Sequence, residues 1–212
     1  MIIAKQKELA EILQLLEGKK KIFLTGCSQC ATTCKFGGEE EVARMAAALT
    51  EAGKEITGTV ILDPSCISLK VKKDLRKAPG CKEAEAILVM ACGDGCQTVA
   101  GNARVPVYPA NDTLFIGEVE RVGRYKEVCR ACGSCELGWT GGICPVTRCA
   151  KGLLNGPCGG SKDGKCEVDP DLDCAWILIY EALKERNELD NLRRIRMPRD
   201  HRKARRLVVN QG

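Results

Sequence analysis

The feature that most constrains this chain is a run of eight cysteines within 46 residues of its second half. It opens with Cys129-Arg-Ala-Cys132-Gly-Ser-Cys135. Such short gaps allow one turning loop to present three thiolates to three corners of a single cubane iron–sulfur cluster, while the fourth thiolate comes from further along the chain. The sequence therefore predicts a metal-binding module here. The other five cysteines of the run are Cys144, Cys149, Cys158, Cys166 and Cys174.

The module has little that could form a hydrophobic core of its own. Residues 129–166 contain nine glycines in 38 positions and almost no periodic apolar pattern. Bound metal would therefore have to organise this segment. A C-terminal helix is expected to follow, with Asp169 as its N-cap and Pro170 at its first position, so that Cys174 falls near the first turn. Its predicted buried stripe is Leu172, Trp176, Ile179 and Leu183.

Length and cysteine usage point to a reduced, intracellular protein. A chain of 212 residues can bury a real core, so its cysteines are not needed to staple a miniature fold. The cysteines number fifteen, the opening residues 1–9 are too polar for a signal peptide, and no apolar run approaches membrane-spanning length. We therefore expect a cytoplasmic protein without a membrane span, in which dense cysteines mean metal rather than disulfides.

The positive charge is concentrated near the C-terminus. Residues 193–206 hold eight Lys and Arg against Asp200 alone, a net +7 in a chain whose net charge is +5. Such a tail can bind nucleic acid, but it lacks interleaved aromatics, and no helix-turn-helix or zinc-finger spacing accompanies it. We expect a solvated arm, or an arm that docks on an acidic partner subunit, and no nucleic-acid partner.

The first half of the chain alternates apolar strands with amphipathic helices. This pattern predicts an α/β fold with a small parallel flavodoxin-like sheet, followed by the loop-rich cysteine module and its helix. The expected strands are residues 22–25, 59–62 and 86–91, with a short one near 107–108. The expected helices are residues 9–16, 39–52 and 69–76. We place the α/β domain at 1–120, the cysteine module at 121–192 and the basic tail at 193–212.

A first metal constellation is expected in the α/β domain. Cys27, Cys30 and Cys34 lie in the loop after the first strand, while Cys66 and Cys92 lie at or just past the ends of two other strands. Because the carboxyl ends of parallel strands share one edge of a sheet, these segments can converge. Cys92 is the preferred fourth ligand and Cys66 the alternative, although either can be an ordinary buried small side chain. Cys81 and Cys96 have no such positional argument and are expected to be non-ligands.

The eight-cysteine module forms a second constellation. Eight thiolates suffice for two cubanes, and the three of the opening run belong largely to one, but spacing does not group the remaining five. All-thiolate zinc sites normally show two C-x2-4-C pairs, which the later gaps of eight, four, eight, seven and seven residues fit poorly. We expect two to three [4Fe–4S] clusters in the chain, with zinc at one site as the competing interpretation.

Catalytic residues are scarce in this sequence. The single histidine, His201, lies in the basic tail, and Glu118 and Glu120 lack the spacing of a catalytic carboxylate pair. Neither G-x-G-x-x-G nor a Walker A motif is present. The chain is therefore expected to hold electrons rather than to transform a substrate, with no active site of its own.

One long string is specific enough to suggest a family. Gly141-Gly-Ile-Cys144-Pro-Val-Thr-Arg-Cys149-Ala-Lys-Gly-Leu-Leu-Asn-Gly-Pro-Cys158-Gly-Gly, continuing through Cys166 to Asp173-Cys174-Ala-Trp, resembles the small cysteine-rich subunit of bacterial methylenetetrahydrofolate reductase (the MetV type). The loop from Gly26 to Cys34 and the segment 91–100 also look like this family. The resemblance covers nearly the whole chain, while the tail beyond Arg193 lies outside the recognisable pattern.

The resemblance implies a place in a redox complex. The protein would relay electrons from a ferredoxin or another redox subunit, through its clusters, to the FMN of a catalytic subunit that makes methyltetrahydrofolate in the acetyl-CoA pathway. The family is also associated with zinc, so the alternative is a zinc-stabilised scaffold subunit that carries no electrons. The ligand candidates implied by matching position are Cys27, Cys30, Cys34, Cys66, Cys92, Cys129, Cys132, Cys135, Cys144, Cys149, Cys158, Cys166 and Cys174.

Overall fold

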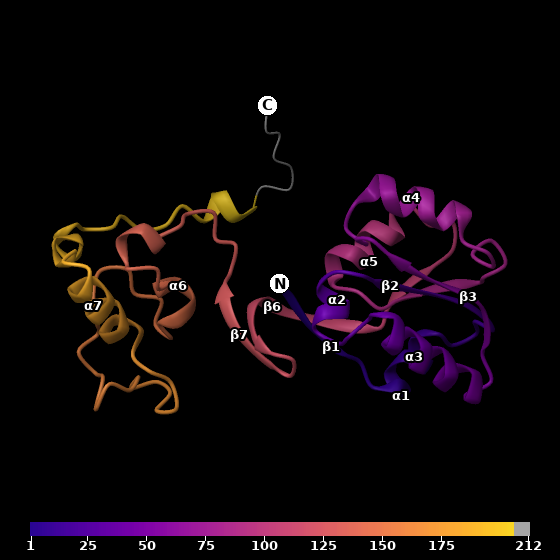
Figure 1. Cartoon of the computed structure of the whole chain (residues 1–212), viewed down its shortest axis with the longest axis horizontal. Helices are drawn as coiled ribbons and strands as arrows, with labels where there is room; N and C mark the ends of the chain where they lie inside the picture. The colour runs from indigo at the N-terminus through magenta and orange to yellow at the C-terminus, as the bar shows by residue number, and fades with distance from the viewer. Residues whose placement is uncertain (206–212) are drawn as a thin grey trace. The chain divides into compact units, whose positions relative to one another are not determined.

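The computed structural model describes residues 1–205, which form two compact units (Figure 1). The first unit ends at Lys126 and the second begins at Glu127. No helix among the described residues is long and apolar enough to cross a bilayer.

The first unit is built on a four-stranded sheet in which every pairing is parallel. Its order is β3-β2-β4-β5, so the chain starts at β2, moves to one side and then crosses to the other. This is the order of the first four strands of flavodoxin-like folds, and it confirms the predicted parallel α/β sheet. The strands are β2 (Lys21–Cys27), β3 (Glu55–Leu62), β4 (Ala86–Val89) and β5 (Val107–Pro109).

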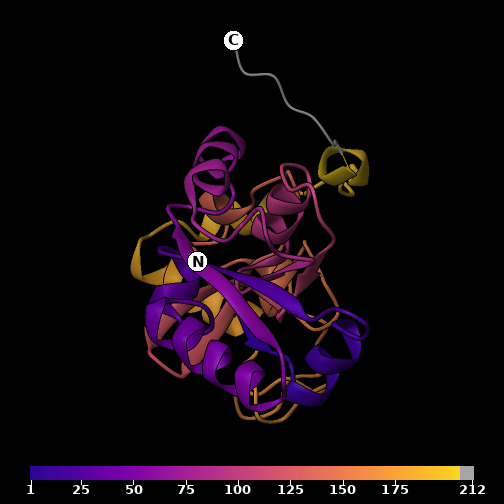
Figure 2. The same cartoon turned by 90° about the vertical axis from the view of Figure 1, so that its right-hand side faces the viewer.

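Helices cover both faces of this sheet, as Figures 1 and 2 show. Along β2, Ile22 and Leu24 pack with the helices of one face, whereas Phe23 packs with those of the other. Strands buried on both sides must be apolar at every position, which is why their sequences read as continuous runs. One face carries α1 (Leu9–Leu15) and α3 (Glu39–Glu51), and the other carries α4 (Ser68–Lys77) and α5 (Gly93–Ala100).

A second, three-stranded sheet was not expected from the sequence. Its order is β1-β6-β7, and β1 runs antiparallel to β6 with Ile2 opposite Ile116. β6 is mostly exposed or half buried and β7 has no buried position, so the apolar alternation is weak. The paired residues of β1 and β6 are also more than a hundred positions apart. The strands are β1 (Ile2–Gln6), β6 (Asn111–Arg121) and β7 (Arg124–Cys129).

The second unit consists mainly of loops around one helix, α7 (Ala175–Glu185). Its apolar core is small and centres on Trp176, Ile179 and Leu183 of that helix. The shorter elements are η1 (Leu137–Trp139), α6 (Pro145–Arg148), η2 (Leu189–Arg193) and η3 (His201–Arg205).

The predicted start of the C-terminal helix was wrong. α7 begins at Ala175 with Cys174 as its N-cap residue, and Leu172 is half exposed rather than part of the buried stripe. Asp169 instead accepts a hydrogen bond from the backbone N–H of Asp171 at 3.1 Å. Such a local turn competes with helix formation for the same backbone groups.

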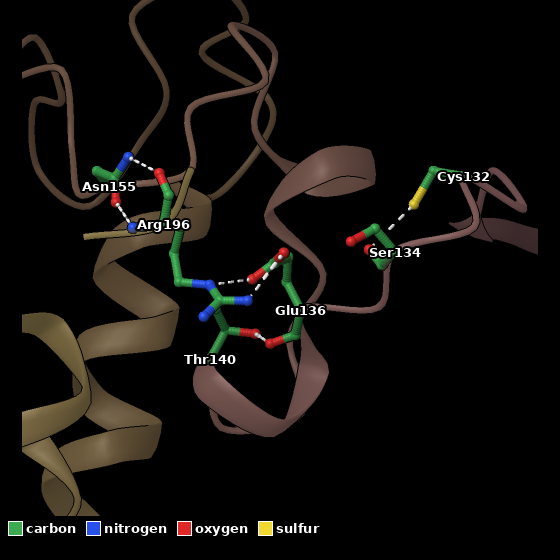
Figure 3. Close-up of polar contacts among 6 residues, drawn as sticks. All are labelled: Cys132, Ser134, Glu136, Thr140, Asn155 and Arg196. Carbon is green, nitrogen blue, oxygen red and sulfur yellow. Dashed lines mark hydrogen bonds and ion pairs between the residues drawn. The ribbon is translucent and has the colours of Figure 1, made fainter. Parts of the chain in front are cut away.

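The first residues of the basic tail are not a solvated arm (Figure 3). The Arg196 guanidinium donates to Glu136, with 2.6 Å between Nε and Oε2. Asn155 holds the backbone of Arg196 from both sides, since its Oδ1 accepts from the N–H at 2.6 Å and its Nδ2 donates to the carbonyl at 2.9 Å. Arg194 and Arg196 also stack on the Trp139 ring, 4.8 and 5.0 Å from its centroid. Residues 206–212 of the predicted tail lie outside the described residues.

The Glu136–Arg196 ion pair gives a stability prediction. The Glu136 side chain is only 5% exposed, so Arg196→Ala leaves a buried carboxylate without its partner and should cost about 3 kcal/mol. The control Arg193→Ala breaks an ion pair with Asp190 whose two side chains are 86% and 88% exposed, and should cost less than about 0.5 kcal/mol. Urea unfolding followed by tryptophan fluorescence measures both, because Trp139 and Trp176 both lie in the second unit. Equal losses in the two variants would contradict this assignment.

Candidate metal centres

Three predicted ligands of the first unit lie together where β2 ends. The strand finishes at Cys27, a one-turn helix α2 (Cys30–Thr33) begins at Cys30, and Cys34 follows that helix directly. Cys27 and Cys34 are buried and Cys30 is half buried. The tight turn of α2 therefore keeps three thiols at the carboxyl end of the central strand.

Gly37 brings the end of this loop close against the sheet. Its carbonyl accepts a hydrogen bond from the Cys27 N–H at 2.9 Å. A Cβ atom at Gly37 would lie 1.8 Å from the carbonyl oxygen of Met90, just past the end of β4. Only glycine allows this approach, so the loop is held against the ends of β2 and β4, where the strand order reverses.

Cys66 and Cys92 lie beyond the two strands that flank β2. Cys66 follows β3 by four residues, and Cys92 is the N-cap residue of α5 after β4. Burial raises the pKa of the Cys66 thiol, and the negative charges of Asp94, Cys27 and Cys92 raise this pKa further. These thiols therefore lie at or beyond the carboxyl ends of three neighbouring parallel strands, which share one edge of the sheet. The choice between Cys66 and Cys92 as fourth ligand stays a prediction.

Cys81 and Cys96, which were expected to be non-ligands, have different surroundings. Cys96 lies one turn after Cys92 on α5, with its N–H bonded to the Cys92 carbonyl at 2.9 Å, and burial followed by the charge of Cys92 raises its pKa. Burial alone raises the pKa of the Cys81 thiol. Sequence reasoning missed the neighbourhood of Cys96 because α5 was not predicted, and the i, i+4 spacing from Cys92 has meaning only on a helix.

Asp63 ties the loops after β2 and β3 together. Its carboxylate accepts hydrogen bonds from the Ser28 hydroxyl and, at 2.8 Å, from Gln29 Nε2. The bond from Ser28 and then that from Gln29 lower the Asp63 pKa. Lys70 Nζ donates to the Asp63 carbonyl at 2.7 Å. Asp63 is therefore a brace between two thiol-bearing loops.

The three-stranded sheet β1-β6-β7 also contacts the loop that bears Cys30 and Cys34. The backbone N–H of Ile2 donates to the Cys30 sulfur at 3.4 Å. The Tyr125 hydroxyl donates to the Cys34 carbonyl at 2.9 Å. The antiparallel sheet therefore supplies polar contacts around the thiols of the α2 loop.

In the second unit, local hydrogen bonds hold two sulfurs of the opening cysteine run. Cys129 ends β7 and its sulfur accepts from the Ala131 N–H at 3.3 Å, while the Cys132 thiol donates to the Ser134 carbonyl at 3.4 Å (Figure 3). The Arg130 pKa is raised first by its hydrogen bond to Glu127, and the charge of Cys144 raises it as well. Cys144 is the N-cap residue of α6.

The other four cysteines of the module line a single small cavity. Its volume is about 20 Å³, and its wall includes Trp176 and the ion pair between Lys151 and Glu167. The Cys158 sulfur accepts from the Gly160 N–H at 3.4 Å. This convergence separates four thiols that spacing alone had left ungrouped. They are Cys149, Cys158, Cys166 and Cys174.

The donor chemistry of these groups suits soft metal centres, although the thiols are not arranged as a finished coordination shell. All fifteen cysteines are free thiols. Within residues 1–205, no three His, Cys, Asp or Glu side chains are arranged so that they could hold a metal ion. Thiolates are the ligands of iron–sulfur clusters and of structural zinc, and such ligands take their final positions with the metal.

Comparison with known protein families supports the resemblance for the second half of the chain. Residues 108–202 match the family described as methylene-tetrahydrofolate reductase C terminal. The match continues to Arg202, so the expectation that the tail beyond Arg193 lies outside the family pattern was wrong for residues 194–202. Residues 1–107 lie outside the match. Neither the curated proteins nor the solved structures gave a match. The similarity to the methylene-tetrahydrofolate reductase C-terminal family therefore extends from Tyr108 to Arg202.

Proposed function

We propose that this protein is the electron-transfer subunit of a methylenetetrahydrofolate reductase complex. Its thiols would hold [4Fe–4S] clusters, and electrons from a ferredoxin or another redox subunit would reach the FMN of a partner catalytic subunit. The observation that carries the proposal is the convergence of thiols into separate groups within a segment that matches this reductase family. Iron–sulfur clusters bound by thiolates supply one-electron chemistry that no side chain of the chain offers.

The convergence supports a grouping of the ligands. In the second unit, Cys129, Cys132, Cys135 and Cys144 would hold one cluster, because they are the cysteines of the module that do not line the small cavity. The four thiols that share a cavity would hold another. The thiols at the sheet edge of the first unit are the candidates for a third.

The surroundings of the sulfurs bear on their redox properties. Backbone N–H groups of Ala131, Gly160 and Ile2 donate to the sulfurs of Cys129, Cys158 and Cys30, respectively. Such bonds favour the more negative, reduced form and raise a cluster's potential. The cations near the thiols should raise the cluster potentials only slightly, since Arg130 and Lys151 are each paired with a glutamate.

One observation favours zinc at the cavity lined by four thiols. Its volume of about 20 Å³ is that of a single ion or water rather than of a cubane. Tetrahedral coordination by four thiolates is the usual arrangement of structural zinc. The second candidate function is therefore a zinc-stabilised scaffold subunit of the same complex that carries no electrons.

Metal and sulfide analysis of anaerobically purified protein separates the two functions. Two or three [4Fe–4S] clusters would give about eight or more irons per chain with matching acid-labile sulfide, and a brown colour that dithionite bleaches. One zinc and about four irons per chain would mean that one site holds zinc and that electron transfer depends on a single [4Fe–4S] cluster. Colourless protein with zinc and no sulfide would refute the proposal and support the scaffold.

Paired cysteine variants test the grouping of the ligands. Cys132→Ser and Cys144→Ser should each remove about four irons, and the double variant should remove no more than either single one, because all three lose the same cluster. Combining Cys132→Ser with Cys166→Ser should instead add the two losses of metal. Metal and sulfide content per chain is the measurement.

Cys81→Ser is the matched control for these variants. Cys81 is half buried like Cys132 and Cys166, but no other thiol contributes to its pKa shift. Its replacement should leave the metal content unchanged. Additive losses from Cys132→Ser and Cys144→Ser, or a loss in the control, would overturn the grouping.

A further inference from the structure

The second unit contains a cavity of about 510 Å³ that is separate from the small cavity among the thiols. Aromatic and aliphatic side chains of η1, α7 and η2 line it, together with two arginines. The chain has only two tryptophans, and both belong to this wall. The lining residues used below are Trp139, Trp176, Tyr180, Leu192, Arg194 and Arg196.

The cavity carries a positive charge that the described chain does not fully neutralise. None of its lining residues is acidic. The Arg196 guanidinium is paired with Glu136, whereas the Arg194 guanidinium stacks on Trp139 and has no carboxylate partner among residues 1–205. An occupant that brings a carboxylate to Arg194 would complete this arrangement.

An exposed apolar strip, formed by Ile195 and Met197, adjoins the arginines that line the cavity. Arg194 is extended, and both arginines of the segment 194–197 stack on Trp139, while the alternating Ile195 and Met197 are 83% and 78% exposed. Tyr180 and Leu192 at the cavity are 43% and 41% exposed. Because Asn155 binds both backbone groups of Arg196, the strip is held in place.

We infer that this cavity and strip form the docking surface for the catalytic partner subunit, which would insert an apolar side chain into the cavity and offer a carboxylate to Arg194. The inference rests on the proposed function. A small ligand in the cavity would leave Ile195 and Met197 exposed, whereas a protein surface covers them. Trp, Tyr, Met and Arg are also the residues enriched at protein–protein interfaces.

The position of Trp176 gives this docking surface a functional consequence. Trp176 lines both the large cavity and the cavity of Cys149, Cys158, Cys166 and Cys174. Its indole N–H donates to the Leu153 carbonyl at 3.2 Å, which fixes the ring between them. A partner bound in the large cavity would be separated from this thiol group by one side chain.

Binding of the purified flavin-containing catalytic subunit to anaerobically prepared, metal-loaded protein tests the inference. Replacing both Ile195 and Met197 by Asp should raise the Kd at least tenfold. Arg194→Glu should raise it as much, because it places a carboxylate against the carboxylate of the partner subunit. The matched control is Leu69→Asp, since Leu69 is 81% exposed but lies on α4 of the first unit. Metal content and tryptophan fluorescence check that each variant keeps its fold.

The outcomes separate this inference from the proposed function. Tight binding by the wild type and the control, with weak binding by both surface variants at unchanged metal content, supports the docking surface. Equal binding by all four proteins overturns the docking surface and leaves the complex intact. A wild type that does not bind the catalytic subunit at all overturns the complex and the surface together.

Discussion

The second unit cannot be held together by its own apolar core. Its buried cluster consists of Cys174, Trp176, Ile179 and Leu183, all from one helix and its cap, while loops of the cysteine module surround them. With so little apolar burial, polar anchors must help to hold the loops, and the metal binding proposed above would add to them. The Glu136–Arg196 pair and the Asn155 bonds are such anchors, and they explain why a nominally basic tail folds back onto the module.

The first unit places its thiols by a different principle. A parallel sheet that is buried on both faces is rigid, and its strand ends lie along one edge whatever the loops contain. Cys27, Cys66 and Cys92 reach that edge through this topology, and the Asp63 brace and the close approach of Gly37 then fix the loops. Thiols in this unit are preorganised by the sheet, whereas those of the second unit depend on loop closure.

The difference between sheet-positioned and loop-positioned thiols explains which features could be predicted from the sequence. The four parallel strands and the meeting of Cys27 with Cys66 and Cys92 follow from apolar periodicity and from one rule about strand ends. The grouping of Cys149, Cys158, Cys166 and Cys174 follows from the path of glycine-rich loops, which carries no periodic signal. The pairing of β1 with β6 and the bond from Arg196 to Glu136 join residues 60 or more positions apart, where sequence spacing gives no signal. The position of Cys96 one turn after Cys92 could not be predicted, because Gly93 and Gly95 weaken the helical signal of α5.

The two proposals meet at one residue pair. Glu136 pairs with Arg196 (Figure 3). Glu136 directly follows Cys135 in the sequence, and Arg196 lies between the exposed Ile195 and Met197. The ion pair that holds the proposed docking strip therefore also fixes one end of the loop that bears Cys129, Cys132 and Cys135. Any interaction that orders the strip then favours the ordered thiol loop, and by linkage a metal-loaded loop favours the ordered strip. A chain built in this way would present its partner surface best when its clusters are in place, so that an empty subunit competes poorly for the complex.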